Sequence, residues 1–291
     1  MEPNPIPPRC AAADPTPKKP SFTPPSGSCD CHSHVLWPQS MYSYVPNRSY
    51  TPPEANLSSY QHMLSTLGLD RAVIVHPSVY GTDNRATLEA IKKGGKNFRG
   101  VAVVDEDIDF SELEGMHQAG IRGVRINLLF EGGIGMSGVK KLTKKVAPLG
   151  WHLQVLIDVS EFDELDTLAD LPVDVVFDHM GHMPTAKGLN DPGFVKMLKM
   201  LERGHAWVKL SGAYRISGNK DLPYADVVPF AQQIIKTNPE NLVWATDWPH
   251  PSVNVPMPND GDLLDLLLDW APDEQTRNRI LVENPAKLYD F

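Results

Sequence analysis

The chain has 291 residues, a hydrophobic fraction of 41%, a charged fraction of 22% and a formal net charge of −9. These values are typical of a soluble globular protein, and the length suits one large domain such as an α/β barrel. The acidic balance argues against nucleic acid or an anionic membrane as a partner, because both require a basic surface. It leaves a small anionic substrate open, since such a ligand responds to local arginines.

The first 27 residues form a proline-rich leader with few side chains that could be buried. Such a segment cannot offset its own ordering entropy. We therefore expect an extension over residues 1–27 that is mobile or strapped on the barrel, and a single catalytic domain over residues 28–291. The sequence has no apolar stretch suited to a signal peptide or a transmembrane segment. Three cysteines without framework spacing indicate a reducing compartment, so we expect a cytoplasmic protein.

Strand and helix patterns alternate eight times after the leader. Strands are predicted over residues 29–36, 71–77, 98–104, 123–128, 152–157, 174–178, 206–210 and 242–246. Helices are predicted over residues 57–67, 86–94, 110–119, 138–147, 162–169, 193–203, 225–237 and 261–270. Eight strands that each precede a helix predict a parallel sheet closed as a (β/α)8 TIM barrel. An open doubly wound sheet is the alternative, but no glycine-rich phosphate loop follows the first strand.

Two histidines stand two residues apart in the first predicted strand. Alternate residues of a strand point to the same face, so His32 and His34 are expected to project together. One such pair is more often structural than catalytic, but further polar residues stand at the C-terminal ends of other strands, where active sites of this fold lie. These residues are Ser78, Tyr80, Arg125, Asp178, His179, Arg215, Asp247 and His250.

Asp247 and His179 have the clearest chemical interpretation. Asp247 follows the buried run VWAT and is expected to act as a general base that takes a proton from water. Its structural alternative is a carboxylate that caps the following turn. His179 is expected to polarise a carbonyl group, or else to be a hydrogen-bonded core histidine. Asp178 is expected to point to the opposite face and to pack or cap under the barrel.

Several other polar residues have two interpretations each. Arg125 lies in an otherwise apolar strand, where a guanidinium requires an anion, either a protein carboxylate or a substrate carboxylate. Arg215 and Tyr50 lie on predicted loops, where an exposed side chain is the default. Ser78 and Tyr80 lead into GTDN, a run typical of a turn and a helix cap.

A metal site is the alternative to a site without a cofactor. A metal hydrolase of this barrel type would need a further ligand, such as a histidine at the end of the fifth strand, whereas His152 begins that strand. The permanent charge of Arg125 would also repel a cation. We therefore favour a site without metal or other cofactor. One divalent ion, Zn²⁺ or Mn²⁺, would instead take its ligands from His32, His34, His179 and Asp247.

Several motifs together resemble the amidohydrolase superfamily. They are HSH at 32–34, PSVYGTDN at 77–84, GVRIN around Arg125, DHMG at 178–181, TDWPHP at 246–251 and the closing ENPAKLYDF. Within the superfamily, residues 29–291 are similar to the metal-independent lactonase branch. That branch includes 2-pyrone-4,6-dicarboxylate lactonase, 4-sulfomuconolactone hydrolase and D-galactarolactone isomerase.

The resemblance implies an amidohydrolase-like TIM barrel in which Asp247 activates water against a lactone carbonyl. It implies that three histidines hold this carbonyl: His32, His34 and His179. It implies substrate contacts from Arg125, Arg215, Tyr50, Ser78 and His250, with Tyr80 beside them. The chain departs from the pyrone dicarboxylate enzymes at Phe130 and Glu131, where those enzymes carry a second arginine. This departure argues against the pyrone dicarboxylate as the substrate.

The predicted function is metal-independent hydrolysis of a small anionic, carboxylated lactone. One alternative is a mononuclear metal-dependent hydrolase or aromatic-acid decarboxylase of the same superfamily. Another is a lactone isomerase; the isomerase of this branch carries an asparagine at the position of Asp247, and a carboxylate there favours attack by water. A barrel that binds a ligand without catalysis is an alternative of another class. The sequence has no signal for a particular oligomeric state.

Overall fold

A computed structural model describes residues 7–127 and 135–291. The departure at Phe130 and Glu131 lies outside the described residues. Eight parallel strands form one sheet in chain order. They are β1 (Cys29–Ser33), β2 (Arg71–Val75), β3 (Phe98–Ala102), β4 (Ile121–Asn127), β5 (His152–Leu156), β6 (Val175–Phe177), β7 (Ala206–Leu210) and β8 (Leu242–Trp244).

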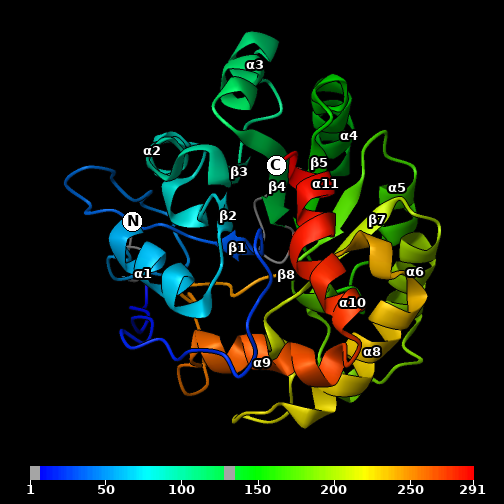
Figure 1. Cartoon of the computed structure of the whole chain (residues 1–291). Helices are drawn as coiled ribbons and strands as arrows, with labels where there is room; N and C mark the ends of the chain where they lie inside the picture. Colours follow the sequence, from blue (N-terminus) through cyan, green and yellow to red (C-terminus); the bar gives the residue numbers. More distant parts are fainter. Residues whose placement is uncertain (1–6, 128–134) are drawn as a thin grey trace.

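Helices follow the strands and surround the sheet (Figure 1). The longer ones are α1 (Leu57–Leu67), α2 (Arg85–Gly94), α3 (Phe110–Gln118), α4 (Met136–Val146), α6 (Pro192–Glu202), α8 (Val228–Thr237) and α9 (Asp260–Trp270). The shorter ones are α5 (Leu165–Ala169), α7 (Ala213–Ile216), α10 (Glu274–Asn278) and α11 (Asn284–Tyr289). The predicted (β/α)8 barrel is confirmed, because every strand is followed by a helix.

Backbone hydrogen bonds join the first strand to the segment after the last one. The amide of Asp247 donates to the carbonyl of His32 at 2.9 Å, and the amide of His34 donates to the carbonyl of Trp248 at 2.8 Å. Asp30 supports this seam, because its carboxylate accepts hydrogen bonds from the Thr246 amide at 2.9 Å and hydroxyl at 2.6 Å. The two ends of the sheet therefore meet where the predicted catalytic residues lie.

The barrel interior has an apolar lower layer and a polar upper layer. The lower layer contains valines from β2, β3, β6 and β8, and the buried Tyr289 of α11 packs against it. Above it lie three fully buried polar side chains, Gln154, Asp178 and Lys209. Polar atoms buried this deeply require partners, so this upper layer is a hydrogen-bonded support for whatever lies at the barrel mouth.

The strand that carries the paired histidines is irregular. The pairing of β1 with β2 shifts register between Asp30 and Ser33. Cys31 belongs to the inner apolar cluster, and the neighbouring His32 also contacts the interior through Lys209. Strict alternation is therefore broken at this point. His32 and His34 do lie close together, as predicted. Their placement depends on this local irregularity, however, and not on the regular strand alternation from which we predicted it.

The leader runs along one side of the barrel. Its Cys10 amide donates to the Thr51 carbonyl at 3.0 Å, in the long segment between β1 and α1. Farther on, the Lys18 amide donates to Asn259 Oδ1 at 2.9 Å, at the start of α9. The Gly27 amide then donates to Asp70 Oδ2 at 2.6 Å, just before β2. None of the helices in the described ranges is long and apolar enough to cross a bilayer.

Candidate active site

The candidate site lies at the C-terminal mouth of the barrel, where β1, β6 and β8 end. His179 and Asp247 both have positive φ angles, of 50° and 68°. Such angles are sterically costly for residues other than glycine and concentrate at functional sites. In each case the chain turns sharply as it leaves the strand, and the turn directs the side chain over the mouth.

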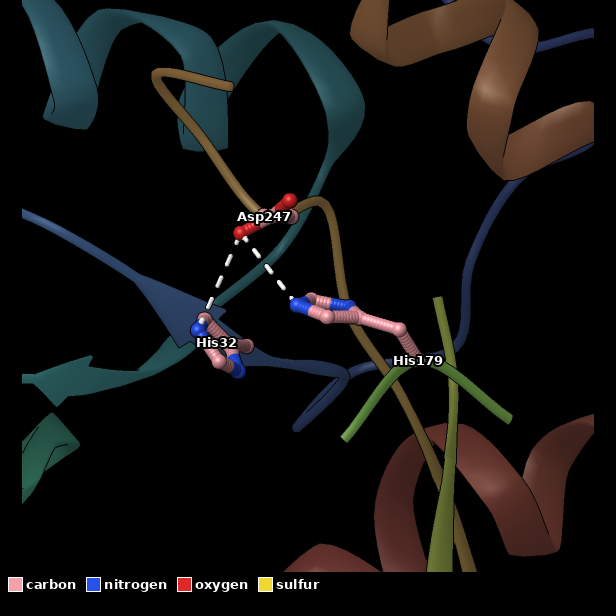
Figure 2. A group of neighbouring side chains, drawn as sticks. All are labelled: His32, His179 and Asp247. Atoms are coloured by element: carbon pink, nitrogen blue, oxygen red, sulfur yellow. Dashed lines mark ion pairs between the residues drawn. The ribbon is translucent and has the colours of Figure 1, made fainter. Parts of the chain in front are cut away.

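The two oxygens of Asp247 have different environments. Oδ2 accepts hydrogen bonds from the Tyr214 hydroxyl and from Arg215 Nε, both at 2.6 Å. Oδ1 lies 3.7 Å from His32 Nε2, 3.8 Å from His179 Nε2 and 3.9 Å from His34 Nε2, distances too long for hydrogen bonds. Figure 2 shows Asp247 facing two of these rings. One oxygen is thus anchored, and the other faces three imidazoles.

Burial and the neighbouring charges set the protonation of this cluster. Burial raises the pKa of Asp247, but the Arg215 guanidinium acts in the opposite direction, and the pKa lies well below the usual 3.8. Burial lowers the pKa of His32 to about 4 and places the pKa values of His34 and His179 well below 6.5. Near neutral pH the cluster therefore contains one carboxylate and three neutral imidazoles.

The remaining ring nitrogens are held by the protein. His34 Nδ1 lies 2.8 Å from the Val75 carbonyl oxygen. A carbonyl can only accept, so Nδ1 carries the proton and His34 Nε2 presents a lone pair to the site. His179 Nδ1 lies 2.9 Å from the Ser211 hydroxyl, which can donate to it. These two hydrogen bonds fix the orientation of the His34 and His179 rings from the side away from Asp247.

These residues open into a cavity of about 390 Å³, a size suited to a small organic ligand. Of the predicted site residues, His34, Tyr50, Ser78, Arg125, His179, Arg215 and Asp247 line it. His32 lies just beneath, completely buried. The structure therefore places these eight predicted residues at one cavity or directly beneath it.

Two predicted substrate contacts lie behind the cavity wall instead. Tyr80 is buried, and its hydroxyl accepts a hydrogen bond from the Trp37 amide at 3.0 Å. His250 is completely buried, with Nδ1 3.0 Å from the Tyr214 hydroxyl and Nε2 3.1 Å from Asp260 Oδ1. Because both polar ends already have protein partners, these residues support the wall rather than face a ligand.

Asp178 also differs from the prediction. It does not pack under the barrel but lies inside it, where its Oδ2 accepts hydrogen bonds from Arg125 Nε at 3.1 Å and from Gln154 Nε2 at 3.0 Å. Asp178 follows the inward-facing Val176 by two positions, and strand alternation turns it inward as well. Arg125 therefore has a protein carboxylate at its Nε and still lines the cavity.

Sequence reasoning missed two polar residues that contact the predicted catalytic groups. Lys209 stands in the apolar run AWVKL of β7, a signal of the same kind as the one that identified Arg125. Tyr214 precedes Arg215, and nothing in the sequence indicates that its hydroxyl reaches Asp247. His182 also lines the cavity.

The donor set could hold a divalent metal. Ligand atoms of His32, His179 and Asp247 all lie within 4.8 Å of one another and are buried. Two imidazoles and a carboxylate form a set used by zinc enzymes, and His32 Nε2 has no hydrogen-bond partner among the described residues. His34 lies outside this closest group. In donor type and spacing, the residues therefore fit one metal ion.

Comparison with known proteins agrees with this geometry. Residues 29–291 match the model of the amidohydrolase family. A 2-pyrone-4,6-dicarboxylate hydrolase of Comamonas testosteroni is 37% identical over 284 residues, which cover 94% of this chain and 93% of that protein. A 4-sulfomuconolactone hydrolase of Hydrogenophaga intermedia is also 37% identical, over 274 residues, 92% of this chain and 90% of that protein.

A solved structure extends the comparison to the fold. A probable 2-pyrone-4,6-dicarboxylic acid hydrolase of Acinetobacter baumannii, solved with citric acid bound, superposes with a TM-score of 0.80 at 28% identity. The match covers 91% of this chain and 100% of that one. With a family match over almost the whole chain and relatives this similar, the protein belongs to the amidohydrolase family.

Proposed function

We propose that this amidohydrolase is a lactone hydrolase that opens a carboxylated lactone, with Asp247 as the base that activates water. The observation that carries the proposal is the asymmetry of Asp247. Its Oδ2 is anchored at 2.6 Å by Tyr214 and Arg215, and its Oδ1 faces three neutral imidazoles across the cavity floor. General base catalysis of hydrolysis requires an ionised carboxylate oxygen in a fixed orientation, next to groups that can hydrogen-bond the water and the carbonyl. Asp247 Oδ1 and the three imidazoles provide these groups.

The first chemical step is attack by water. Asp247 Oδ1 accepts one proton of the water, and the lone pair on His34 Nε2 accepts a hydrogen bond from the other. The water oxygen forms a bond to the lactone carbonyl carbon, whose oxygen takes up negative charge. His32 and His179 stabilise that charge from the other side of Asp247. Donors placed where charge develops contribute strongly to catalysis, by about 10²-fold to 10³-fold in rate for one donor.

The second step is ring opening. The tetrahedral intermediate collapses, the ring C–O bond breaks, and the leaving alkoxide or enolate takes the proton from Asp247. The products are a new carboxylic acid and a hydroxyl group on the same molecule. Asp247 returns to its ionised form, so the cycle needs no other co-reactant.

Two arginines support an anionic substrate. Arg125 and Arg215 both line the cavity, and among the described residues protein carboxylates engage Arg125 at Nε and Arg215 at Nε and one terminal nitrogen. Arginine binds carboxylates through paired N–H groups, which suits a substrate carboxylate beside the ring. The names of the two hydrolases above describe lactones with acidic substituents, and this agrees with the same substrate class.

A metal-dependent hydrolase is the second candidate, favoured by the close spacing of His32, His179 and Asp247. These residues would hold the ion, which would polarise the lactone carbonyl and lower the pKa of bound water. We favour the metal-independent reaction because Arg215 already neutralises Asp247 and because two further cations, Arg125 and Lys209, lie next to the cluster.

The test is an assay of the purified protein against pairs of lactones that differ only in a ring carboxylate. We expect turnover of a carboxylated member, with a product heavier by one water molecule, and little or none of its uncharged partner. A product of unchanged mass would identify an isomerase. Thermal stabilisation by carboxylated lactones without any product would identify a barrel that binds without catalysis.

A further inference from the structure

Lys209 lies in the polar layer directly beneath the histidine cluster. Its side chain is completely buried. Its Nζ donates to Gln154 Oε1 at 2.8 Å and to the Cys31 carbonyl at 3.0 Å, and it lies 3.3 Å from His32 Nδ1. An ammonium group has three hydrogens and no lone pair, so these three neighbours can use all of its hydrogens. Asp178 Oδ1 lies farther away, at 3.6 Å, as an ion-pair partner.

The direction of these hydrogen bonds is set from both sides. Gln154 Nε2 donates to Asp178 Oδ2 at 3.0 Å, because a carboxylate only accepts. The amide of Gln154 is therefore oriented with its oxygen toward Lys209. Arg125 Nε also donates to Asp178 Oδ2, at 3.1 Å, which holds this carboxylate in place. Lys209 is consequently a donor toward each of its neighbours, His32 Nδ1 included.

We propose that Lys209 holds His32 in the tautomer with the proton on Nε2, so that His32 presents an N–H to the substrate carbonyl and is a poor metal ligand. Lys209 is then a positioning residue that acts through His32. The carbonyl contact rests on the proposed function, but the tautomer itself does not. His32 Nε2 is buried and lacks a hydrogen-bond partner in the described part of the chain, as a donor reserved for a substrate would.

Asp178 is the competing partner for His32 Nδ1. Its Oδ1 lies 3.2 Å from that nitrogen, and an N–H there could in principle donate to it. This contact does not meet hydrogen-bond geometry, since none of the described groups makes a hydrogen bond to Asp178 Oδ1. The charge of Oδ1 is instead balanced by the Lys209 ammonium, whose Nζ lies 3.6 Å from it. The Lys209 contact, at 3.3 Å, does have hydrogen-bond geometry.

The two histidines of the HSH motif then have opposite tautomers. His34 donates from Nδ1 to a backbone carbonyl and presents a lone pair, whereas His32 accepts at Nδ1 and presents an N–H. A metal ion needs a lone pair on Nε2 of His32. To supply it, the proton would have to move to Nδ1, which would break the bond from Lys209. The residue that orients His32 for hydrogen bonding therefore also opposes metal binding.

Nuclear magnetic resonance on the unaltered protein tests the tautomer without any substrate. Histidine labelled with ¹⁵N gives long-range ¹H–¹⁵N correlations that distinguish a protonated ring nitrogen from an unprotonated one. His32→Gln and His34→Gln identify the two sets of signals. We expect His32 to be protonated on Nε2 and His34, the internal reference, on Nδ1. A proton on Nδ1 of His32 would overturn the proposal and assign that contact to Asp178.

A second experiment measures zinc binding to Lys209→Met. The matched control is Lys145→Met. Lys145 Nζ also donates to two backbone carbonyls, of Glu106 at 2.9 Å and of Ile108 at 2.8 Å, but it lies outside the barrel interior. We expect Lys209→Met to bind zinc at least about 10-fold more tightly than the unaltered protein and the control, the size of effect that residues behind metal ligands have. Equal affinities would overturn the proposal.

Turnover separates this inference from the proposed function. If lactone is hydrolysed, Lys209→Met should lower kcat by roughly 10-fold to 100-fold with little change in KM, as expected when an oriented carbonyl donor is lost. If no lactone is hydrolysed, the tautomer and the zinc affinities still decide the role of Lys209. If Lys209→Met does not fold, the spectrum of the unaltered protein still decides it.

Discussion

Replacement of Asp247 by asparagine tests the proposed base with little disturbance of its surroundings. Oδ2 of Asp247 accepts two hydrogen bonds, from the Tyr214 hydroxyl and from Arg215 Nε, each at 2.6 Å. The asparagine must therefore place its carbonyl oxygen there and its amide nitrogen at the position of Oδ1. That nitrogen then lies 3.9 Å from the lone pair of His34 Nε2. The variant therefore keeps both anchoring contacts and loses only the carboxylate oxygen that faces the imidazoles.

The expected loss is in kcat. A positioned general base contributes about 10²-fold to 10⁴-fold, which corresponds to about 3 to 5 kcal/mol in the barrier. The amide cannot take a proton from water, so this whole contribution should disappear. Substrate binding should persist or tighten, because Arg215 keeps its hydrogen bond to the new amide oxygen but loses its protein counter-charge, which leaves its positive charge to a substrate carboxylate.

The assay is steady-state hydrolysis of a carboxylated lactone by Asp247→Asn, with thermal unfolding as a check that the variant is folded. A calorimetric titration with an unreactive lactam of the same shape measures binding separately. The reasoning predicts a large fall in kcat and an affinity that is unchanged or higher. A folded variant whose kcat stays within about threefold of the original would remove Asp247 as the base.

Three further predictions concern supporting parts of the molecule. Gly212→Ala should lower kcat and cost about 1 to 2 kcal/mol in unfolding free energy, because φ is 62° and the new Cβ would lie 2.8 Å from His179 Nδ1. The control is Gly150→Ala, at a left-handed residue with φ of 68° and open space for the Cβ, which should show only the loss of stability. Equal kcat in the two variants would refute the reasoning. Burial lowers the pKa of His152 to about 3, below its unfolded value of about 6.5, so its neutral form stabilises the fold and that stability is lost as pH falls below 6.5. Between pH 7 and pH 5, the free energy of unfolding of His152→Leu, measured with urea, should therefore fall by roughly 2 kcal/mol less than that of the original protein. Equal falls in the two proteins would contradict this. Deletion of residues 1–27 should raise KM, because the leader is hydrogen-bonded to the long segment between β1 and α1, which contributes Tyr50 to the cavity lining. An unchanged KM would show that this segment holds its shape without the leader.

The sequence was sufficient for the architecture and for seven of the fifteen described residues that line the cavity. Short valine-rich runs such as AVIV repeat between helical patterns, and a closed parallel sheet is the arrangement that buries them on both faces. Arg125 was identifiable because a charge in an apolar strand needs a partner. Once the fold is a barrel, residues at the C-terminal strand ends must share one mouth, which brought His179, Arg215 and Asp247 together.

Other features depend on contacts that no local pattern encodes. The register shift in β1 places His32 beside Cys31 in the interior, contrary to simple alternation. The hydroxyl of Tyr214 donates to Asp247, 33 positions away in the sequence, and the same hydroxyl is the hydrogen-bond partner of His250 Nδ1. Tyr80 and His250 were expected to contact substrate, since their positions suit the mouth, but only the packed structure shows that their polar atoms already have partners.

The central claim is hydrolysis of a carboxylated lactone without a metal. The most direct measurement is elemental analysis of the purified protein, followed by hydrolysis assays of the same sample before and after treatment with a chelator. The account predicts metal well below one equivalent per chain and the same kcat in both assays. One equivalent of zinc or manganese, with activity that the chelator removes and the metal restores, would contradict it and make His32, His179 and Asp247 ligands.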